Sequence, residues 1–439
     1  MTRLTIVFLM KSRCYHAKIR LIKQAGERME DEIFLEQLKK YAELAIKIGL
    51  NVQKNDEVII TIAIDQATLA HLLVEQAYLA GAKNVILQWQ DEQKRRLDLT
   101  YQTETELKQV ASFKNDLSHY IVDNRVKRLT VMSSDPQALA DLDPRKISAA
   151  QSASNSGTRA VKMATENNWL SWTIIAAASP AWAQKVFPDE NPETSTQHLW
   201  QEIFKAVRID QEDPLKAWQQ QKEKLIAKAK LLNQYQFDQL HYVAPGTDLM
   251  IGLPKNHVWE VASSLNEKGE EFIPNMPTEE VFTAPDAKRV DGYVRATRPL
   301  SYAGTVISGM AFTFERGHVI KVEAEQGLHL LEQLLKTDSG ASMLGEVALV
   351  PNPSPISQSG ITFFNTLFDE NAANHLALGA AYPFSIAGGS KMNQLQLQLA
   401  GLNVSQIHVD FMIGSENMSI DGHTTDGQVV PIFRSGDWA

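Results

Sequence analysis

The stretch QIHVDFMIGS at residues 406–415 carries an imidazole and a carboxylate two positions apart. Its apolar residues alternate with His408 and Asp410, which is the period of a half-buried strand. Side chains two apart on a strand project from the same face, so these two are predicted to lie together. Such a pair alone is more often structural than metal-binding, and its meaning depends on what else gathers beside it.

Two further stretches of the C-terminal half place carboxylates at the start of apolar runs. In NMPTEEVFTAP (275–285), Glu279 and Glu280 are adjacent, so on an extended chain they face opposite ways and at most one enters a given site. A solvated acidic turn is the alternative. In GEVALVPN (345–352), Glu346 directly precedes an apolar run, where it is expected to serve as a helix-cap partner or as a ligand.

The segment FFNTLFDENAANHLALGAAYP (363–383) adds Glu370 and His375. On one helix these residues would lie roughly 140° apart around the axis and would not share a face. A loop or the start of a helix is therefore the better setting for both to reach one centre. Taken singly, His375 also fits a buried histidine with satisfied hydrogen bonds.

Together these signals form a set of four carboxylates and two imidazoles, enough for two divalent cations with one carboxylate bridging. Oxygen-rich ligation with some imidazole suits zinc, cobalt, manganese or magnesium. Two such ions polarise a carbonyl and lower the pKa of a bridging water, whereas burying four carboxylates without cations would be very costly. The set comprises Glu280, Glu346, Glu370, His375, His408 and Asp410.

The elements that must position this set fall into two parts. Strand-like runs at 56–64, 83–90, 130–134 and 170–179, with helical patterns at 67–82 and after residue 140, predict a parallel sheet. We expect an α/β domain at residues 29–235, ending in a bridging helix within 211–240. Short runs divided by Gly, Pro and Asn predict an α+β domain with antiparallel strands at 236–439.

Composition limits the classes of function. The 439 residues carry 43 Lys+Arg and 52 Asp+Glu, a formal net charge of −9, which gives no case for nucleic-acid binding. A single cysteine excludes an intramolecular disulfide and fits a cytoplasmic protein. No stretch approaches the ~20 apolar residues that span a bilayer. The parallel sheet carries neither GxGxxG nor GxxxxGK[ST], so a nucleotide cofactor has no support.

The first 28 residues are expected to be a non-native extension, with translation starting at Met29. An amphipathic helix is predicted from Met29 onward, and Gln24–Arg28 can be encoded by purine-rich codons that resemble a ribosome-binding site. The alternative is a natural but disordered tail. No small-residue cleavage site is evident, so a secretory signal is not expected.

Four of these segments resemble the aminopeptidase T family of metallopeptidases, which includes aminopeptidase S and aminopeptidase II. They occur in the family's order and at similar spacing, and the resemblance covers residues 29–439. It implies a two-domain chain that forms a homodimer, acts on peptides with a free N-terminus and carries two divalent metal ions, zinc or cobalt foremost. The segments are NMPTEEVFTAP, LGEVALV, FDENAANHLALGAAY and IHVDFMIGS.

The resemblance also assigns roles to residues of this chain. All six residues of the set become metal ligands, with Glu346 as the bridging carboxylate. Tyr382, after LGAA, matches a tyrosine near the metals and could donate its hydroxyl to the oxyanion formed when a metal-bridged hydroxide attacks the amide. Glu279 or Glu346 would transfer the water proton to the leaving amine.

Two other functions stay open at this stage. A metal-independent serine hydrolase or amidase lacks GxSxG, and the serines of SQSG (357–360) and AGGSKMN (387–393) have no obvious histidine partner. A metal-stabilised peptide-binding protein would use a closed site, which is usually rich in Cys and His. The carboxylate-rich set argues against that site.

Overall fold

The computed structural model describes residues 31–133, 135, 138–139, 141–261, 263–302 and 305–439. The expectation that residues 1–28 are an extension lies outside this range. The predicted N-terminal amphipathic helix is present over 31–44 and widens into a π-helical turn, η1, at Ala45–Gly49. Its apolar face is buried, because Leu38 and Tyr41 are 3% and 0% exposed.

The N-terminal part is built on a four-stranded parallel sheet in the order β2-β1-β3-β4, as the strand–helix–strand spacing predicted. Its strands are β1 (Glu57–Ala63), β2 (Asn84–Gln90), β3 (Lys127–Met132) and β4 (Trp172–Ala176). The elements between them are η2 (Ile64–Gln66), α2 (Ala67–Leu79), α3 (Glu92–Tyr101), α4 (Glu104–Leu107), α5 (Ser112–Asp123), α6 (Pro144–Gly157) and α7 (Arg159–Glu166).

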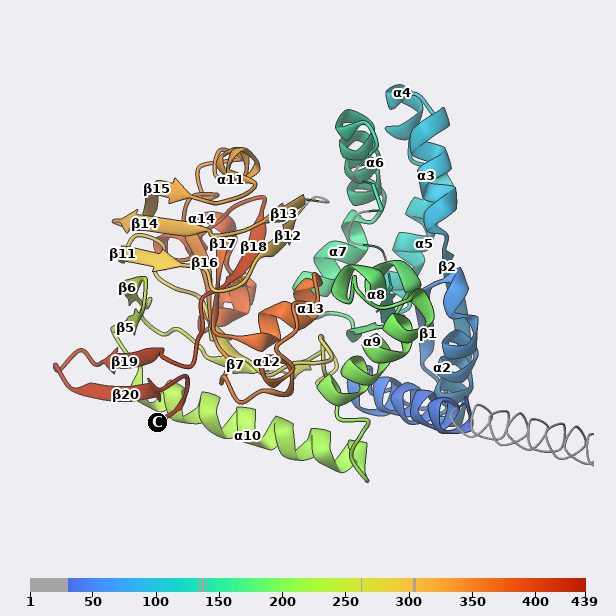
Figure 1. The fold of residues 1–439 in the computed structure, drawn as a ribbon, viewed down its shortest axis with the longest axis horizontal. Helices are drawn as coiled ribbons and strands as arrows, with labels where there is room; N and C mark the ends of the chain where they lie inside the picture. Colours follow the sequence, from blue (N-terminus) through green and yellow to red (C-terminus); the bar gives the residue numbers. More distant parts are fainter. Residues whose placement is uncertain (1–30, 134, 136–137, 140, 262, 303–304) are drawn as a thin grey trace, which may run out of the picture.

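Three helices lead from this sheet to the C-terminal half. They are α8 (Pro180–Val186), α9 (Pro192–Ala206) and α10 (Pro214–Tyr235), and each has Pro in its first turn, where the missing N–H costs nothing. Helix α10 is the predicted bridging helix. It runs along the base of the molecule from the N-terminal part to the C-terminal strands (Figure 1).

The C-terminal half contains a five-stranded antiparallel sheet in the order β18-β17-β16-β10-β7. One face of this sheet is apolar and the other carries polar side chains. Val409 and Phe411 on one face belong to the C-terminal hydrophobic core, whereas His408 and Asp410 project from the other. The strands are β7 (Glu260–Val261), β10 (Val281–Thr283), β16 (Leu344–Leu349), β17 (His375–Gly379) and β18 (His408–Met412).

An eight-stranded antiparallel sheet packs beside it in the order β15-β14-β11-β6-β5-β19-β20-β21. Its strands are β5 (Gln239–Ala244), β6 (Thr247–Gly252), β11 (Val290–Arg295), β14 (Ala311–Glu315), β15 (His318–Glu323), β19 (Ser419–His423), β20 (Val429–Arg434) and β21 (Asp437–Trp438). Two small hairpins pair β8 (Ser264–Leu265) with β9 (Glu271–Phe272), and β12 (Leu300–Tyr302) with β13 (Thr305–Ile307). The remaining elements are α11 (Leu328–Leu334), α12 (Pro355–Gln358), α13 (Thr366–Asp369), η3 (Glu370–Ala372), η4 (Pro383–Ser385), η5 (Gly389–Lys391) and α14 (Gln394–Leu399).

The largest hydrophobic core crosses the predicted boundary between the two domains. Ile273, Met276, Phe363 and Phe368 pack into the core of the N-terminal sheet. The chain at 274–276 also bonds to β4, since Ile174 N–H donates to Pro274 O at 2.7 Å and Met276 N–H to Ile174 O at 3.0 Å. The segment leading to Glu279 and Glu280 is thus held by the N-terminal part. Among the described residues, no helix combines the length and apolarity needed to cross a membrane.

Candidate metal centre

Four neighbouring strands bring five of the six predicted ligands to one face of the five-stranded sheet. Glu280 directly precedes β10, Glu346 lies in β16, and His375 begins β17. In β18, His408 and Asp410 share this face, as the alternation predicted. The opposite face is filled by core residues such as Leu376 and Val409, which fixes the register because a one-residue slip would turn the charged side chains into this apolar core.

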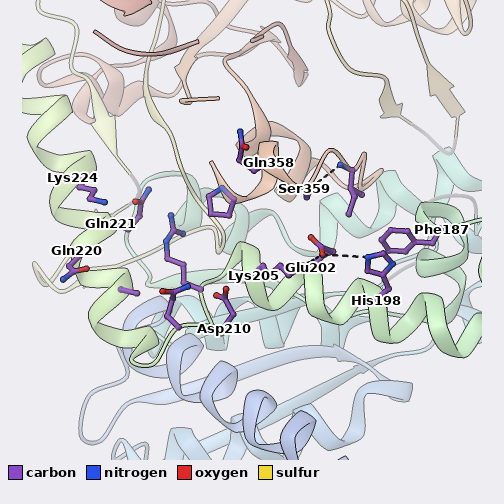
Figure 2. Close-up of a pocket in the computed structure, with 15 residues that line it drawn as sticks. Phe187, His198, Glu202, Lys205, Asp210, Gln220, Gln221, Lys224, Gln358 and Ser359 are labelled. Carbon is purple, nitrogen blue, oxygen red and sulfur yellow. Dashed lines mark hydrogen bonds and ion pairs between the residues drawn. The ribbon is translucent and has the colours of Figure 1, made fainter. Parts of the chain in front are cut away.

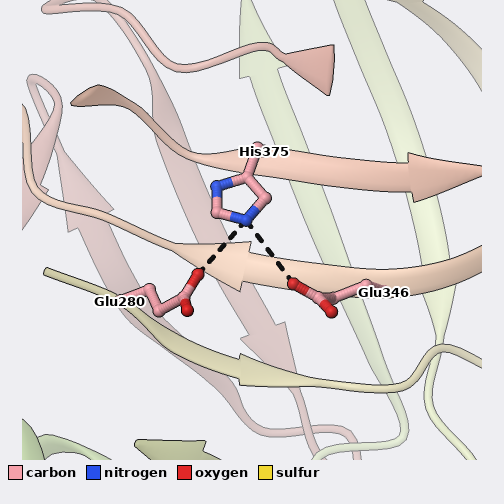
Figure 3. A group of neighbouring side chains, drawn as sticks. All are labelled: Glu280, Glu346 and His375. Atoms are coloured by element: carbon pink, nitrogen blue, oxygen red, sulfur yellow. Dashed lines mark ion pairs between the residues drawn. The ribbon is translucent and has the colours of Figure 1, made fainter. Parts of the chain in front are cut away.

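The first close group contains Glu280, Glu346 and His375 (Figure 3). His375 Nε2 lies 3.3 Å from Glu280 Oε2 and 3.5 Å from Glu346 Oε1. All three residues are buried, with exposed fractions of 9%, 5% and 1%. Figure 3 shows both carboxylates pointing at the same ring nitrogen from two adjacent strands.

The second close group contains Glu346, His408 and Asp410. His408 Nε2 lies 3.5 Å from Glu346 Oε2 and 3.4 Å from Asp410 Oδ1. Glu346 therefore belongs to both groups and offers a different oxygen to each. This is the placement that a bridging carboxylate requires.

In each of the two imidazoles, the hydrogen bond made by Nδ1 determines which ring nitrogen carries the proton. Nδ1 of His375 contacts the carbonyl of Ala373 at 3.2 Å, and Nδ1 of His408 contacts that of Ala380 at 2.7 Å. A proton on Nδ1 is needed for these bonds, so in the neutral ring Nε2 carries the lone pair that binds metals. Both lone pairs then face carboxylate oxygens, an arrangement that positive charge between them, from a proton or a metal ion, would stabilise.

The distances agree with ligands arranged around an ion. A charge-assisted N–H···O bond would bring N and O to about 2.7–2.9 Å, well inside the 3.3–3.5 Å seen here. Two ligand atoms on a tetrahedral centre with bonds of about 2.0–2.1 Å stand about 3.3–3.4 Å apart. In the described part of the chain, Asp410 Oδ1 is also buried without a hydrogen-bond donor. The donor set fits divalent metal ions.

Burial and crowding of like charges shift the pKa values of the groups in this site. Burial raises the pKa of Glu346 and, together with Asp410 and Glu280, raises that of Glu370 well above its ordinary value. Burial alone would lower the pKa of His408, but Asp410 and Glu346 raise it to about 10. The buried carboxylates thus favour positive charge in their midst.

Glu370 lies beside the two groups rather than within them. It begins the short helix η3, the setting expected from its spacing to His375. Asn371 Nδ2 donates to Glu370 Oε1 at 3.4 Å, and the Glu370 carboxylate interacts electrostatically with Asp410 and Glu280. It is near enough to act on the same centre, while none of its oxygens joins the tight clusters.

Tyr382 packs against the second group. Its ring centroid lies 5.0 Å from that of His408, and it stacks on Phe384 at 5.2 Å. Burial and the nearby carboxylates, Glu346 first, raise the pKa of Tyr382 well above its usual value. The phenol therefore stays protonated and can donate a hydrogen bond.

The comparisons with known proteins agree with this donor set. The sequence pattern of the family described as thermophilic metalloprotease (M29) matches residues 34–438. The chain belongs to this family. It is 50% identical over 406 residues to aminopeptidase PepS of Streptococcus thermophilus, covering 92% of this chain and 98% of that protein. It is 45% identical over 406 residues to aminopeptidase AmpS of Bacillus subtilis (strain 168), covering 92% and 99%.

A solved structure supports the same assignment. The structure described as wild-type AmpT from Thermus thermophilus matches with a TM-score of 0.87 and 41% identity, covering 92% of this chain and 100% of that one. The predicted resemblance to the aminopeptidase T family is confirmed. As an M29 metalloprotease, the chain is a metal-dependent peptide hydrolase, which sets aside the serine-hydrolase and binding-protein alternatives.

In this M29 protein, Glu279 points away from the centre. Arg208 Nη2 donates to Glu279 Oε1 at 2.6 Å, and Gln221 Nε2 donates to Oε2 at 2.6 Å. The adjacent carboxylates 279 and 280 thus face opposite ways, as predicted. With both oxygens occupied by donors, Glu279 is poorly placed to carry a proton in the reaction, which weakens the role suggested for it from sequence.

Sequence reasoning missed the residues that hold Glu279 and its neighbours. Arg208 and Gln221 are distant from the motifs along the chain, and no local pattern marks them. Asn371 sits inside the motif and is fully buried at 0% exposure. Its Oδ1 accepts from the backbone N–H of Glu279 at 2.7 Å, so it is a link between two parts of the site.

Proposed function

We propose that this metal-dependent aminopeptidase holds two divalent ions on its five-stranded sheet, with Glu346 bridging them. The first group, Glu280 and His375, would bind one ion, and the second, His408 and Asp410, the other. The observation that carries the proposal is the position of Glu346, whose two oxygens face different imidazoles at 3.5 Å each. Glu370, which the family resemblance also implies as a ligand, lies outside both close groups and would face them from η3.

When bound, two such ions polarise a scissile carbonyl and make water nucleophilic at neutral pH. The chain's own residues then have to orient the amide and move protons. Tyr382 is held protonated beside His408 and would donate its hydroxyl to the developing oxyanion. Its stacking on Phe384 keeps the ring in place.

Of the carboxylates in the site, Glu370 is the best placed to transfer a proton. Of the two carboxylates first considered, Glu279 is occupied by Arg208 and Gln221, and Glu346 is needed to bridge. The carboxylate of Glu370 is close to both groups and accepts one long hydrogen bond, from Asn371 at 3.4 Å. It would take the water proton and deliver it to the leaving amine.

The substrates we propose are peptides with a free N-terminus. The relatives in Streptococcus thermophilus and Bacillus subtilis are both named aminopeptidases, and the chain covers nearly their whole length. Zinc or cobalt suits a site with two imidazoles, and manganese or magnesium is the alternative. We further propose a cytoplasmic homodimer with domains at 29–235 and 236–439. Light scattering during gel filtration tests the oligomeric state.

The deciding experiment measures release of leucine from a leucine-chromophore amide before and after chelation. We expect activity to vanish on chelation and to return when zinc, cobalt, manganese or magnesium is added back. An N-acetylated substrate serves as the control and should not be cleaved. Titration of the returning activity against bound metal should saturate at two ions per chain. Saturation at one ion, or activity indifferent to chelation, would overturn the two-metal proposal.

A further inference from the structure

Glu279 forms a buried connection between the metal centre and the N-terminal part of the chain. It is 3% exposed, and it precedes the proposed ligand Glu280 by one residue. Because successive side chains of an extended segment face opposite ways, fixing Glu279 also fixes the direction of Glu280. A rotation of the backbone here would move both carboxylates together.

Two residues outside the C-terminal sheet fix this carboxylate. Arg208 lies in the turn between α9 and α10, with φ at +61°, and its guanidinium carbon stands 5.4 Å from the ring centroid of Trp218. Trp218 in turn donates from Nε1 to the carbonyl of Val207 at 2.6 Å, which anchors the turn. Gln221 belongs to α10. The contact with Trp218 and the hydrogen bond of Trp218 to Val207 therefore orient the arginine side chain.

Arg208 and Gln221 also line a cavity of about 800 Å³ between α9, α10 and the α12 region (Figure 2). Figure 2 places Gln221 and Lys224 on the α10 side of this cavity. Burial raises the pKa of Glu279, while Arg208 first and then Lys224 act in the opposite direction as nearby positive charges. The ion-pair partner of Glu279 is thus on the N-terminal side, where Arg208 Nη2 lies 2.6 Å from Glu279 Oε1.

The main chain of Glu279 also connects to the segment that contains Glu370. Its N–H donates to Asn371 Oδ1 at 2.7 Å, while Asn371 Nδ2 donates to Leu367 O at 3.1 Å and to Glu370 Oε1 at 3.4 Å. Two segments that supply proposed ligands, at 280 and at 370, therefore meet at one residue. Arg208 and Gln221 hold the side chain of Glu279, whose main chain makes this link to Asn371.

We propose that Arg208, assisted by Gln221, is a positioning residue for the metal centre, acting through Glu279 on the geometry of Glu280. The inference rests on the proposed function, because it assumes that Glu280 binds a metal ion. It makes the N-terminal part a component of the active site and not merely an appended domain. Partners that orient a ligand typically change metal affinity about 10–100-fold when removed.

The sign of the effect separates positioning from simple charge. Removing the cation Arg208 takes a positive charge away from the neighbourhood of the metal site, so electrostatics alone would not weaken the binding of a divalent cation. Loss of positioning would weaken it. Weaker metal binding in the variant Arg208→Ala therefore supports positioning, because the loss of charge does not account for it. Arg208→Lys, which keeps the charge and one donor, should recover part of the loss.

The experiment measures the dissociation constants of zinc and cobalt for the full chain by competition with a chromophoric chelator. We expect Arg208→Ala and the neutral double variant Arg208→Gln/Glu279→Gln to weaken metal binding about tenfold or more. Arg125→Ala is the matched control. It removes another arginine–carboxylate contact between the two parts, with Glu267 at 2.8 Å, and should leave the metal affinity unchanged.

A second variant guards against misfolding. Gln221→Ala removes one hydrogen bond from an uncharged donor and leaves the ion pair, and it should weaken metal binding by a smaller factor than Arg208→Ala. Wild-type affinity in all these variants, or tighter binding in Arg208→Ala, would overturn the positioning role. That outcome differs from failure of the proposed function, in which the wild-type chain itself would bind no divalent ion.

Discussion

His375 and His408 lie on adjacent antiparallel strands, and both direct Nε2 at the carboxylate of one residue, Glu346. Each of the two nitrogens stands 3.5 Å from its own carboxylate oxygen. The backbone carbonyls behind the rings hold the opposite nitrogens. This shared carboxylate joins the two halves of the site, so it is the first residue to test.

Glu346→Gln should remove most bound metal and lower kcat/KM at least about 10³-fold, equivalent to about 4 kcal/mol of transition-state stabilisation. The amide keeps the shape of the side chain but not its charge, so it cannot bridge two cations. Metal content after dialysis and kcat/KM on a leucine amide are the measurements. Glu416→Gln, an exposed position between β18 and β19, is the control. Full metal content with full activity in Glu346→Gln would contradict the bridging role.

Glu370→Gln should separate proton transfer from metal binding. Because its oxygens lie outside both close groups, we expect metal content to fall little while kcat drops about 10²–10⁴-fold. Pre-steady-state and steady-state rates on the same substrate check whether the chemical step is the one slowed. A variant that loses its metal in proportion to its activity would make Glu370 a ligand only.

Tyr382→Phe should lower kcat about 10²–10³-fold with unchanged metal affinity, since only a hydrogen-bond donor to the oxyanion is lost. The phenyl ring preserves the stack on Phe384. Phe384→Leu is a useful comparison, because it removes the stack and keeps the hydroxyl. If Tyr382→Phe leaves kcat intact, the hydroxyl has no part in the chemistry.

Trp182→Phe should destabilise the protein by about 2–4 kcal/mol. Trp182 in α8 is fully buried, and its Nε1–H donates to the carbonyl of Phe363 at 2.6 Å across the two halves of the chain. The variant leaves a void and an unpaired buried carbonyl. Urea unfolding measures the loss. Trp89→Phe, at a 42% exposed position, should change stability little.

The raised pKa of Glu260 predicts a pH-dependent contribution to the free energy of unfolding. Burial raises the pKa of Glu260 from 4.5 to about 7. A carboxyl whose pKa is raised by folding favours the folded state most below pH 4.5, and this contribution disappears as the pH rises through 7. The loss amounts to up to about 3 kcal/mol. Glu260→Gln cannot ionise and should therefore escape it.

The pH experiment compares the free energies of unfolding of wild type and Glu260→Gln at pH 5 and pH 8. At pH 8 the variant should be the more stable of the two by up to about 3 kcal/mol. At pH 5 the difference between their free energies of unfolding should be smaller. Other groups titrate equally in both proteins and cancel in the difference. An equal gap at both pH values would show that Glu260 has an ordinary pKa.

Local periodicity predicted much of this fold. Alternation in IHVDFMIGS set His408 and Asp410 on one face, and the same rule turned Glu279 and Glu280 in opposite directions. The strand–helix–strand spacing of residues 56–90 predicted parallel strands, and β1 and β2 are parallel. These features depend on neighbours within a few residues of the chain, and the 2.0 and 3.6 periods encode them directly.

Tertiary structure alone decided which of those faces meet. The order β18-β17-β16-β10-β7 makes Glu346 the shared member of two groups, and no spacing in the sequence states that order. Arg208 and Glu279 are 71 positions apart and belong to different halves of the chain, yet one partly buried ion pair joins them. Such contacts arise when large apolar surfaces pack, and that packing depends on all the elements at once. The sequence by itself specified which side chains each element would present.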